Sequence, residues 1–222
     1  RWLGFIWDEG PDPNKPGQYL GTYGPYRQSE RLDLYERYVR TLLEQKNAYH
    51  CFCTTEELEG ERQSMMSQGI PPRYSGKCRS LPEEESKQRI ADGTPSVIRF
   101  KTPEEKITFA DIIRGKVTFD AALMGDMVIA KGLREPLYNF AAAVDDHHME
   151  ISHVIRAEDH LANTPKQIAI QDALGFPHPI YAHLPLILNP DRSKMSKRFA
   201  ATAIAQYRSE GYLPQALVNF IA

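Results

Sequence analysis

The sequence predicts an α/β fold and, before residue 135, a smaller α+β segment, and stretches in the second half of the chain carry the α/β prediction. The apolar run Leu184-Pro185-Leu186-Ile187-Leu188 has the length and content of a strand buried on both faces, and the turn-forming Asn189-Pro190-Asp191 follows it. Ile151 to Arg156 alternate as another strand, and Thr164-Pro165 begins a helix that Gly175 ends. In open α/β sheets, ligands bind at the carboxyl ends of such strands.

A basic segment follows the apolar run. Lys194-Met195-Ser196-Lys197-Arg198 places two lysines and an arginine just beyond the predicted turn. A lysine ammonium at the carboxyl end of a strand can hold a triphosphate and the negative charge that develops as its bond breaks. A solvated basic surface loop is the alternative interpretation of these five residues.

Length and composition limit the class of protein only weakly. With 222 residues, of which 41% are hydrophobic and 25% charged, the chain can bury a real core in one or two domains. The formal net charge of -2 gives no overall basicity, so any binding of RNA has to come from local patches. The sequence has no long uncharged apolar run and no secretory start, and we therefore expect no membrane association and a cytoplasmic location.

The first fifty residues predict helical packing against the sheet. Arg1 to Gly10 is rich in large apolar residues and indicates the end of a packed helix followed by a short connection, and Pro11 to Pro16 indicates a loop. Ser29 is a suitable cap for the next helix, whose apolar residues recur at helical spacing. These apolar residues are Tyr35, Tyr38, Val39 and Leu42. We expect this stripe to belong to the core.

All three cysteines lie in the α+β segment, between residues 51 and 78. Cys51 and Cys53 flank a single residue, and Cys78 follows a helix that a capping box at Thr54-Thr55-Glu56-Glu57 begins. A fold that brings the three thiols together would bind zinc. One disulfide with one free thiol is disfavoured in a reducing compartment, and three unrelated buried thiols are the remaining alternative.

The rest of the α+β segment contains several predicted short strands. Leu81 to Thr94 indicates a loop that is acidic early on, and Ser96 to Phe100 a half-exposed strand. Ile107 to Asp120 predicts a hairpin around Arg114-Gly115-Lys116, and Asp126 to Lys131 one more strand. Several basic residues here can line an RNA backbone, or can form a solvated face. They are Arg99, Lys101, Arg114, Lys116, Lys131 and Arg134.

Six blocks along the chain together resemble the bacterial or organellar glutamyl-tRNA synthetases, which are class I aminoacyl-tRNA synthetases. In order, the blocks are Trp7-Asp8-Glu9-Gly10-Pro11, Gly24-Pro25-Tyr26-Arg27-Gln28-Ser29, Pro136-Leu137-Tyr138-Asn139-Phe140, Val154-Ile155-Arg156-Ala157-Glu158-Asp159-His160, Asn163-Thr164-Pro165 and Lys194-Met195-Ser196-Lys197-Arg198. The resemblance covers essentially the whole chain. Six ordered blocks at compatible spacing are far more specific than one lysine loop.

The resemblance implies a Rossmann-like catalytic domain, divided by the insertion. Residues 1–50 belong to its first part, 51–134 form the inserted, zinc-containing domain that binds the tRNA acceptor end, 135–201 form its second half with the lysine loop, and 202–222 begin a helical stem-contact region. The chain starts without methionine and contains no HIGH signature, so we expect a fragment that lacks this N-terminal segment and the anticodon-binding domain. We expect the fragment alone to be inactive, and the enzyme to be a monomer in the cytoplasm, or in the matrix of an organelle.

The resemblance also implies roles for individual residues. Tyr138 and Arg156 contact the substrate glutamate, and Lys194 and Lys197 are catalytic. The expected ATP-binding residues are Glu158, Asp159, His160, Ile187, Lys194, Ser196 and Lys197. Read without the resemblance, Tyr138 is a core aromatic, and Arg156 forms a structural ion pair with Glu158 or Asp159.

The same resemblance implies a ligand set for zinc. Cys51, Cys53 and Cys78 match the cysteine ligands of these enzymes and their queuosine-modifying relatives, and Tyr74 matches a tyrosine that serves as fourth ligand in the latter. Some relatives have a histidine where this chain has Ser80. The segment Asp145-Asp146-His147-His148 is not expected to bind a metal, because four consecutive residues cannot all point at one ion, and we expect turn or capping roles for it.

The implied activity is that of a glutamate–tRNA ligase. It activates glutamate with ATP and Mg²⁺ in the presence of tRNA, and it transfers the glutamyl group to tRNA(Glu). A glutaminyl-tRNA synthetase, a glutamyl-queuosine tRNA(Asp) synthetase and a non-catalytic zinc-containing RNA-binding protein are the alternatives. The pair Cys51 and Cys53 with the Val154 to His160 block favours the glutamyl branch, and the intact Lys194 to Arg198 loop disfavours the queuosine enzyme.

Overall fold

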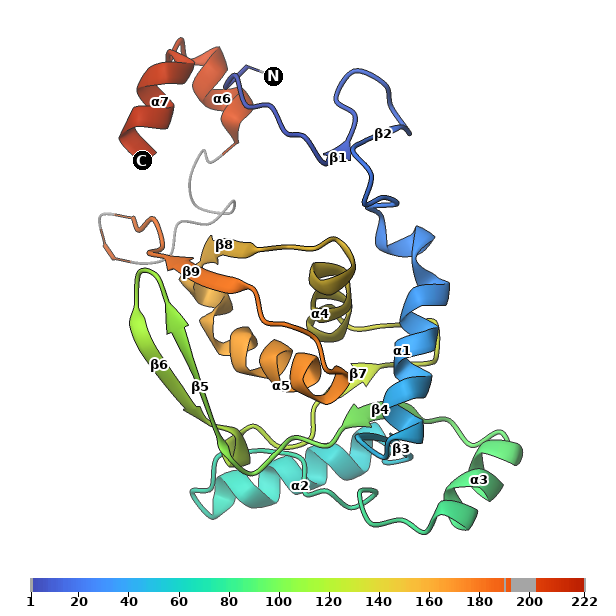
Figure 1. Ribbon diagram of the computed structural model, residues 1–222. Coiled ribbons are helices and arrows are strands. Elements are labelled where there is room, and N and C mark those ends of the chain that lie inside the picture. The colour runs from blue at the N-terminus through green and yellow to red at the C-terminus, as the bar shows by residue number, and fades with distance from the viewer. Residues whose placement is uncertain (1, 190, 193–202, 222) are drawn as a thin grey trace.

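A four-stranded sheet with the order β6-β5-β9-β8 lies at the centre of the computed structural model, which describes residues 2–189, 191–192 and 203–221. β5 (Lys106–Asp111) and β6 (Gly115–Asp120) form the predicted antiparallel hairpin. β8 (His153–Ala157) runs parallel to β9 (Ile180–Leu184), which in turn runs parallel to β5. The hairpin falls within residues 51–134, yet it is hydrogen-bonded into the sheet of the second half of the chain (Figure 1).

Three helices pack together beside this sheet (Figure 1). α1 (Leu32–Glu44) contacts both α4 (Tyr138–His148) and α5 (Thr164–Leu174), and α5 contacts β5. The predicted stripe of α1 is confirmed, because Tyr35, Val39 and Leu42 are fully buried and Tyr38 packs partly buried against the same core. α5 begins and ends as predicted, with Pro165 in its first turn and Gly175 in the left-handed conformation beyond its end.

The cap predicted for α1 is wrong. Ser29 lies inside the short 3-10 helix η1 (Gln28–Glu30), so α1 begins two residues later than a cap at Ser29 requires. Arg31 occupies the capping position, and its guanidinium forms an ion pair with Asp145 of α4 at 2.7 Å. The Arg31 side chain thus makes a tertiary contact and no capping hydrogen bond.

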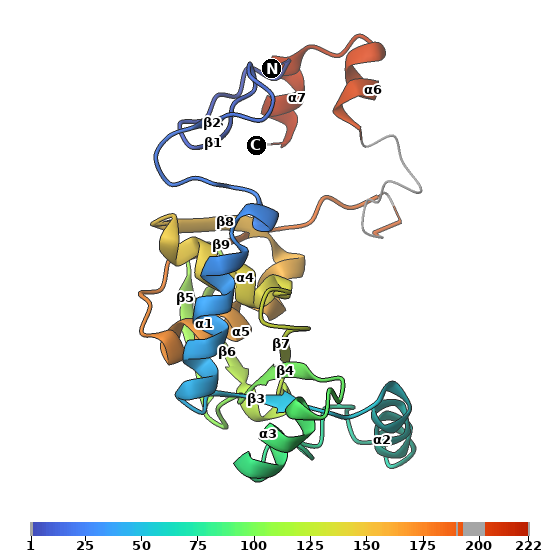
Figure 2. The ribbon, with the colours of Figure 1, turned by 90° about the vertical axis from the view of Figure 1, so that its right-hand side faces the viewer.

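A second, three-stranded antiparallel sheet has the order β3-β4-β7 and lies toward the end of the molecule that carries α2 (Figures 1 and 2). It consists of β3 (Ala48–Cys51), β4 (Val97–Phe100) and β7 (Val128–Ala130). β4 is its middle strand and is buried along Ile98 to Phe100, so the predicted half-exposed strand exists but is not half-exposed. α2 (Thr55–Ser67) begins with the predicted capping box between Thr54 and Glu57.

The acidic segment predicted as a loop contains a helix, α3 (Glu83–Ala91). Three glutamates occupy its first turn, where negative charge stabilises the helix end, and its basic residues lie one turn further on. Lys87 pairs with Glu83 at 2.9 Å and Arg89 pairs with Glu85 at 2.5 Å, each at a spacing of four residues. These local pairs stabilise a helix that has no buried residue.

The N-terminal helix predicted for the first ten residues is absent from the described residues 2–9. Phe5, Ile6 and Trp7 are exposed there, and the chain continues into a small hairpin of β1 (Gly10–Pro11) and β2 (Tyr19–Leu20). The helices expected at the other end of the chain are present as α6 (Ile204–Ser209) and α7 (Pro214–Ile221). Both ends lie together, opposite α2 and α3 (Figures 1 and 2).

The apolar run at 184–188 is not a buried strand. The buried part of β9 is Tyr181 to His183, and Leu184, Ile187 and Leu188 are each about half exposed. Pro185 has no amide hydrogen for the hydrogen-bond ladder, which explains why the strand ends one residue before it.

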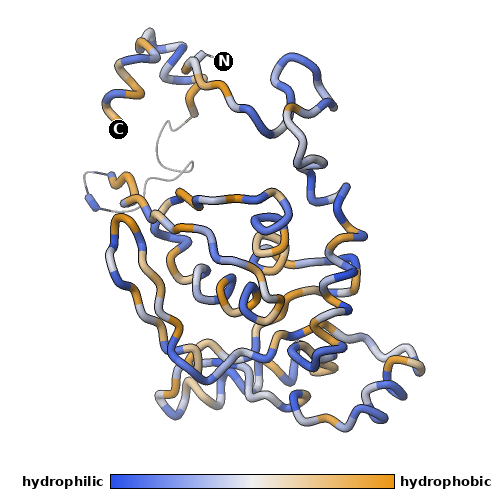
Figure 3. The backbone as a smooth tube through the Cα atoms, viewed as in Figure 1, coloured by the Kyte–Doolittle hydropathy of each residue, from blue (hydrophilic) through white to orange (hydrophobic). Residues whose placement is uncertain are grey.

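The β5–β6 hairpin has an apolar tip, as the tube coloured by hydropathy shows (Figure 3), and Ile112 and Ile113 are exposed there.

Candidate functional site

The carboxyl ends of β5, β8 and β9 meet at one edge of the central sheet, and Arg156 lies there on β8. Its Nε donates a hydrogen bond to Nε2 of His183 on β9 at 3.1 Å, and its Nη2 donates to the hydroxyl of Thr164 at 2.8 Å. Arg156 and His183 are also direct partners in the strand register. Arg156 thus donates its hydrogen bonds to His183 and Thr164. The sequence alone had suggested Glu158 or Asp159 as its structural ion-pair partner.

Asp111, the last residue of β5, holds His183 from the other side. One carboxylate oxygen lies 2.6 Å from Nδ1 of His183, and both side chains are fully buried. Burial raises the pKa of Asp111, but hydrogen bonds from His183 and from the backbone amides of Arg114 and Ile113 outweigh it and lower this pKa to about 2. Sequence reasoning missed Asp111, His183 and Thr164; the available signal was a histidine within an apolar strand segment.

Glu158 and Arg114 form an ion pair that links the β5–β6 hairpin to the chain after β8. Glu158 also accepts a hydrogen bond from the amide of Leu186 at 3.1 Å, and Arg114 Nε lies 3.4 Å from the carbonyl of His183. Glu158, predicted to line the ATP pocket, therefore already contacts the loop that leads toward the lysine segment. Arg114 is engaged in this ion pair, so it is not a free cation for RNA.

Two other basic residues predicted to line RNA are also engaged within the protein. Arg99 is only 7% exposed, and its Nη1 donates to the carbonyl of Asp126 at 2.7 Å, so the prediction that it lines an RNA backbone is wrong. Arg134 forms ion pairs with Asp33 and Glu36 of α1. The burial of β4 explains the first case, because all of Ile98 to Phe100, including Arg99, is buried.

Tyr138 is the first residue of α4 and is 52% exposed, so it is not the core aromatic that its apolar neighbours suggest. Its hydroxyl lies 3.3 Å from Nδ1 of His160, whose ring centroid is 5.6 Å from that of Tyr138. The amide of Asn163 lies 3.3 Å from the same nitrogen. Tyr138 and His160, assigned to glutamate and to ATP respectively, are thus brought together.

The remaining predicted ATP and catalytic residues are only partly described. Ile187 is 49% exposed and Asp159 is exposed, beyond the carboxyl ends of β9 and β8 respectively. Lys194, Ser196 and Lys197 lie outside the described residues.

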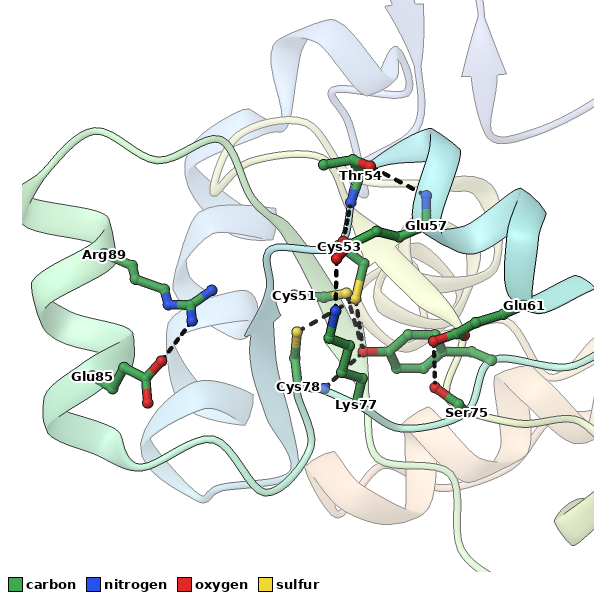
Figure 4. Close-up of polar contacts among 11 residues, drawn as sticks. Cys51, Cys53, Thr54, Glu57, Glu61, Ser75, Lys77, Cys78, Glu85 and Arg89 are labelled. Carbon is green, nitrogen blue, oxygen red and sulfur yellow. Dashed lines mark hydrogen bonds and ion pairs between the residues drawn. The ribbon is translucent and has the colours of Figure 1, made fainter.

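The three cysteines converge, as the zinc prediction requires (Figure 4). Their sulfur atoms all lie within 4.8 Å of one another, and Cys53 Sγ is 3.6 Å from Cys78 Sγ. The Tyr74 hydroxyl lies 3.4 Å from Cys51 Sγ and 3.5 Å from Cys53 Sγ. In a tetrahedral zinc site with ordinary bond lengths, two sulfurs are about 3.8 Å apart and a sulfur and an oxygen about 3.5 Å. The donor set therefore fits zinc, whereas Ser80 is exposed.

The electrostatics of this cysteine site are uneven. Burial raises the pKa of Cys53 to about 12, in spite of its contact with Tyr74. Burial also raises the pKa of Cys51, but hydrogen bonding with Tyr74 and the neighbouring Arg99 lower it below its ordinary value overall. The Arg99 guanidinium lies 3.8 Å from the centre of the Tyr74 ring, which is a cation–π contact. A cation over the ring and a backbone donor from Cys78, at 2.9 Å, hold the phenol in place.

The segment Asp145 to His148 makes tertiary contacts and not the turn or capping contacts that we expected. Asp145 accepts hydrogen bonds from Arg31 and from Tyr35, both at 2.7 Å. The ring of His147 stacks on Phe176 at 3.7 Å. These residues form the last turn of α4 and connect it to α1 and to the segment after α5.

Comparison with known proteins decides the family. Residues 1–222 match the family described as tRNA synthetases class I (E and Q), catalytic domain. The chain belongs to this family. Its Rossmann-like fold agrees with the class I synthetase fold predicted from the sequence, and the family uses ATP with Mg²⁺.

The relatives that this chain matches are named glutamate–tRNA ligases. The chain is 54% identical to glutamate–tRNA ligase 2 of Caldanaerobacter subterraneus and 50% identical to glutamate–tRNA ligase of Carboxydothermus hydrogenoformans, covering all of the chain and 45% of each relative. A crystal structure of a glutamate tRNA ligase from Elizabethkingia meningosepticum in complex with its amino acid matches with a TM-score of 0.84 and 38% identity, over all of this chain and 48% of that one. The chain thus spans less than half the length of these relatives.

The described part of the chain contains no helix that is both long and apolar enough to cross a membrane.

Proposed function

We propose that the protein containing this chain is a glutamate–tRNA ligase that uses ATP, glutamate and tRNA(Glu). The observation that carries the proposal is the placement of Arg156. It lies near the carboxyl end of a parallel strand, where α/β folds bind ligands, and the sheet holds its planar guanidinium through His183 and Thr164. A guanidinium held in this way suits a carboxylate, because it can donate two parallel hydrogen bonds. The names of the relatives support glutamate as the substrate whose carboxylate Arg156 binds.

In the first step, a carboxylate oxygen of glutamate attacks the α-phosphorus of ATP, the bond to the β-phosphate breaks, and pyrophosphate leaves. In the second step, the terminal ribose hydroxyl of tRNA attacks the acyl carbon and AMP leaves. Arg156 and Tyr138 bind and orient glutamate, while Glu158, Asp159, His160 and Ile187 line the nucleotide pocket. Lys194, Ser196 and Lys197 contact the phosphates, and the two lysines stabilise the charge that develops there. No covalent intermediate with the protein is required.

The cysteine site supports a structural role for zinc. Cys51, Cys53 and Cys78 would bind the ion with Tyr74 as the fourth ligand, and such a closed site leaves no open position for chemistry. Its effect would be to link β3 to the start of α2 and to the segment before α3. Zinc thereby stabilises the proposed acceptor-binding insertion and takes no part in either reaction step.

The test is pyrophosphate exchange by the full-length protein, with tRNA present. We expect exchange that depends on glutamate and on tRNA(Glu), followed by glutamylation of that tRNA. Exchange that depends on glutamine would indicate a glutaminyl-tRNA synthetase, and transfer to tRNA(Asp) would indicate the queuosine enzyme. RNA binding without any exchange would refute an enzymatic function. A cytoplasmic location and a monomeric state stay predictions.

A further inference from the structure

A line of hydrogen bonds crosses three strands of the central sheet and ends on Arg156. It runs from the Asp111 carboxylate on β5 to Nδ1 of His183 on β9, at 2.6 Å, and from Nε2 of His183 to Nε of Arg156 on β8, at 3.1 Å. We infer that Asp111 and His183 are positioning residues that fix the guanidinium of Arg156 for the substrate carboxylate. This inference rests on the proposed function of Arg156.

The donors and acceptors along this line have only one consistent arrangement. Because the pKa of Asp111 is about 2, its side chain is a carboxylate that can only accept, and the proton in the short contact belongs to Nδ1 of His183. Nε2 then carries a lone pair that accepts from Nε of Arg156. The Thr164 hydroxyl, 3.0 Å from Nε2, donates to the same lone pair and accepts from Nη2 of Arg156. The carboxylate of Asp111 thus selects the histidine tautomer that Arg156 needs.

The position of His183 leaves it little freedom. Its side chain is fully buried, its backbone lies opposite Arg156 in the parallel register, and the rings of Tyr181 and Phe109 lie 6.1 and 6.5 Å away. Nε and Nη2 of Arg156 are both engaged with this fixed group and with Thr164, while Nη1 has no hydrogen-bond partner among the described residues. The guanidinium plane is therefore set before substrate arrives, which is how a binding group is preorganised.

Asp111 also closes the β5–β6 turn, and this structural role uses its other oxygen. Oδ1 accepts from the amides of Ile113 at 3.0 Å and Arg114 at 2.9 Å, and it lies 3.3 Å from the amide of His183. Oδ2 contacts the imidazole. Since the two roles belong to different atoms, one substitution can separate them.

Asp111→Asn is that substitution. The carbonyl oxygen of asparagine keeps the turn contacts, and its amide nitrogen takes the place of Oδ2 and donates to Nδ1 of His183. His183 must then carry its proton on Nε2, where it faces the N–H of Arg156 donor to donor. The same exchange beside a catalytic histidine is known to leave geometry intact while it imposes the wrong tautomer.

Asp126→Asn is the matched control. Asp126 is as buried as Asp111, at 4% exposure, and its carboxylate also accepts a backbone amide, from Thr102 at 2.9 Å, and a hydrogen bond from Tyr49 at 2.7 Å. It also pairs with the partly exposed Arg79 at 2.9 Å, as Asp111 pairs with His183. It lies beside the three-stranded sheet, next to β7, and has no hydrogen bond to Arg156, His183 or Thr164. The control therefore carries the general effect of placing an amide at a buried aspartate.

Two measurements on the full-length protein and both variants test the inference. In pyrophosphate exchange with tRNA present, Asp111→Asn should raise the KM for glutamate at least about tenfold and leave the KM for ATP within twofold, whereas Asp126→Asn should leave both within twofold. In ¹⁵N NMR of labelled histidine and arginine, Asp111→Asn alone should exchange the His183 tautomer and shift the Nε–H signal of Arg156.

A glutamate KM within twofold of the parent in Asp111→Asn overturns the inference, as does an equal rise in the KM for ATP or an equal effect in the control. Failure of the parent protein to catalyse exchange refutes the proposed function. The NMR measurement then decides by itself whether Asp111 and His183 position Arg156. In that case an unchanged Arg156 signal in Asp111→Asn overturns the inference, and a shift that accompanies the tautomer exchange supports it.

Discussion

Asp146 provides a prediction in which the sign of a pH effect follows from burial. It lies on the last turn of α4 and lines a pocket of about 490 Å³ together with His148 and His178. Burial raises the pKa of Asp146 from 3.8 to about 6, the nearby Arg156 opposes this shift, and Asp145 adds to it. Folding thus stabilises the neutral form of the Asp146 side chain relative to its charged form.

The shift destabilises the folded protein at neutral pH. Below the unfolded pKa of 3.8, both states hold the proton and the side chain contributes nothing. Between that value and about 6, the unfolded state releases the proton first, so the free energy of unfolding falls as the pH rises, and it levels off above 6. A full shift of this size corresponds to roughly 3 kcal/mol, and the partial exposure of the Asp146 side chain makes that figure an upper limit.

Asp146→Asn removes the ionisation and keeps the size of the side chain. Equilibrium urea unfolding of parent and variant should show a gain in the free energy of unfolding of about 1–3 kcal/mol at pH 7.5, which shrinks toward zero as the pH falls to 4. Titrating groups that do not interact with Asp146 contribute equally to both proteins and cancel in the difference. An equal effect at both pH values, or a loss at pH 7.5, would refute the reasoning.

Asp145→Asn is the control from the same helical turn. Asp145 accepts from the buried Arg31 and from Tyr35, so its loss leaves a cation without its partner. This variant should destabilise the protein at pH 7.5, by less than the roughly 3–5 kcal/mol of a fully buried pair, because the Asp145 side chain is 24% exposed. Two neighbouring aspartates are therefore predicted to respond with opposite signs.

Four further predictions concern activity and metal content. Arg156→Lys should weaken glutamate use although it keeps the charge, because a lysine cannot reproduce the planar two-point contact; an unchanged KM and kcat for glutamate would make Arg156 structural. Lys197→Ala in the full-length protein should raise the barrier to adenylate formation by about 2.7–4 kcal/mol without affecting folding, and pyrophosphate exchange within twofold of the parent would contradict this. The purified protein should carry at most one zinc per chain, and since structural zinc can supply roughly 10–16 kcal/mol of apparent binding energy, chelation should lower the melting temperature; absence of zinc with unchanged melting would remove the site. Residues 1–222 alone should neither activate glutamate nor charge tRNA, because the chain spans less than half the length of its relatives and positioning of the reactants is worth about 7–11 kcal/mol of the barrier. Turnover above that of a Lys197→Ala control would contradict this prediction.

Several elements of the fold could be predicted because their determinants are local. The stripe of α1, the capping box between Thr54 and Glu57 and the left-handed Gly175 each depend on residues within one or two helical turns. The β5–β6 turn at Gly115 is equally local. The same holds for the family, because its ordered blocks are properties of the sequence alone.

Other elements could not be predicted because they depend on which surfaces are covered. Apolar content indicated burial at 184–188, but Pro185 ended the strand early and left those side chains half exposed. The apolar start of the chain likewise forms no helix within residues 2–9, and its Phe5, Ile6 and Trp7 are exposed. Conversely, α3 has no buried residue, and its charge pairs were present in the sequence but were interpreted as the acidity of a loop.

The sequence by itself determined the family, the cysteine cluster as a candidate site, and Arg156 as a candidate carboxylate ligand. Only the tertiary structure decided how Arg156 is held, because the residues that hold it are distant in the chain. Asp111 and His183 are separated by 72 positions, and only the parallel pairing of β5, β9 and β8 brings them into line with Arg156. The tautomer of a histidine depends on its neighbours in space, and the identity of those neighbours is a property of the folded sheet.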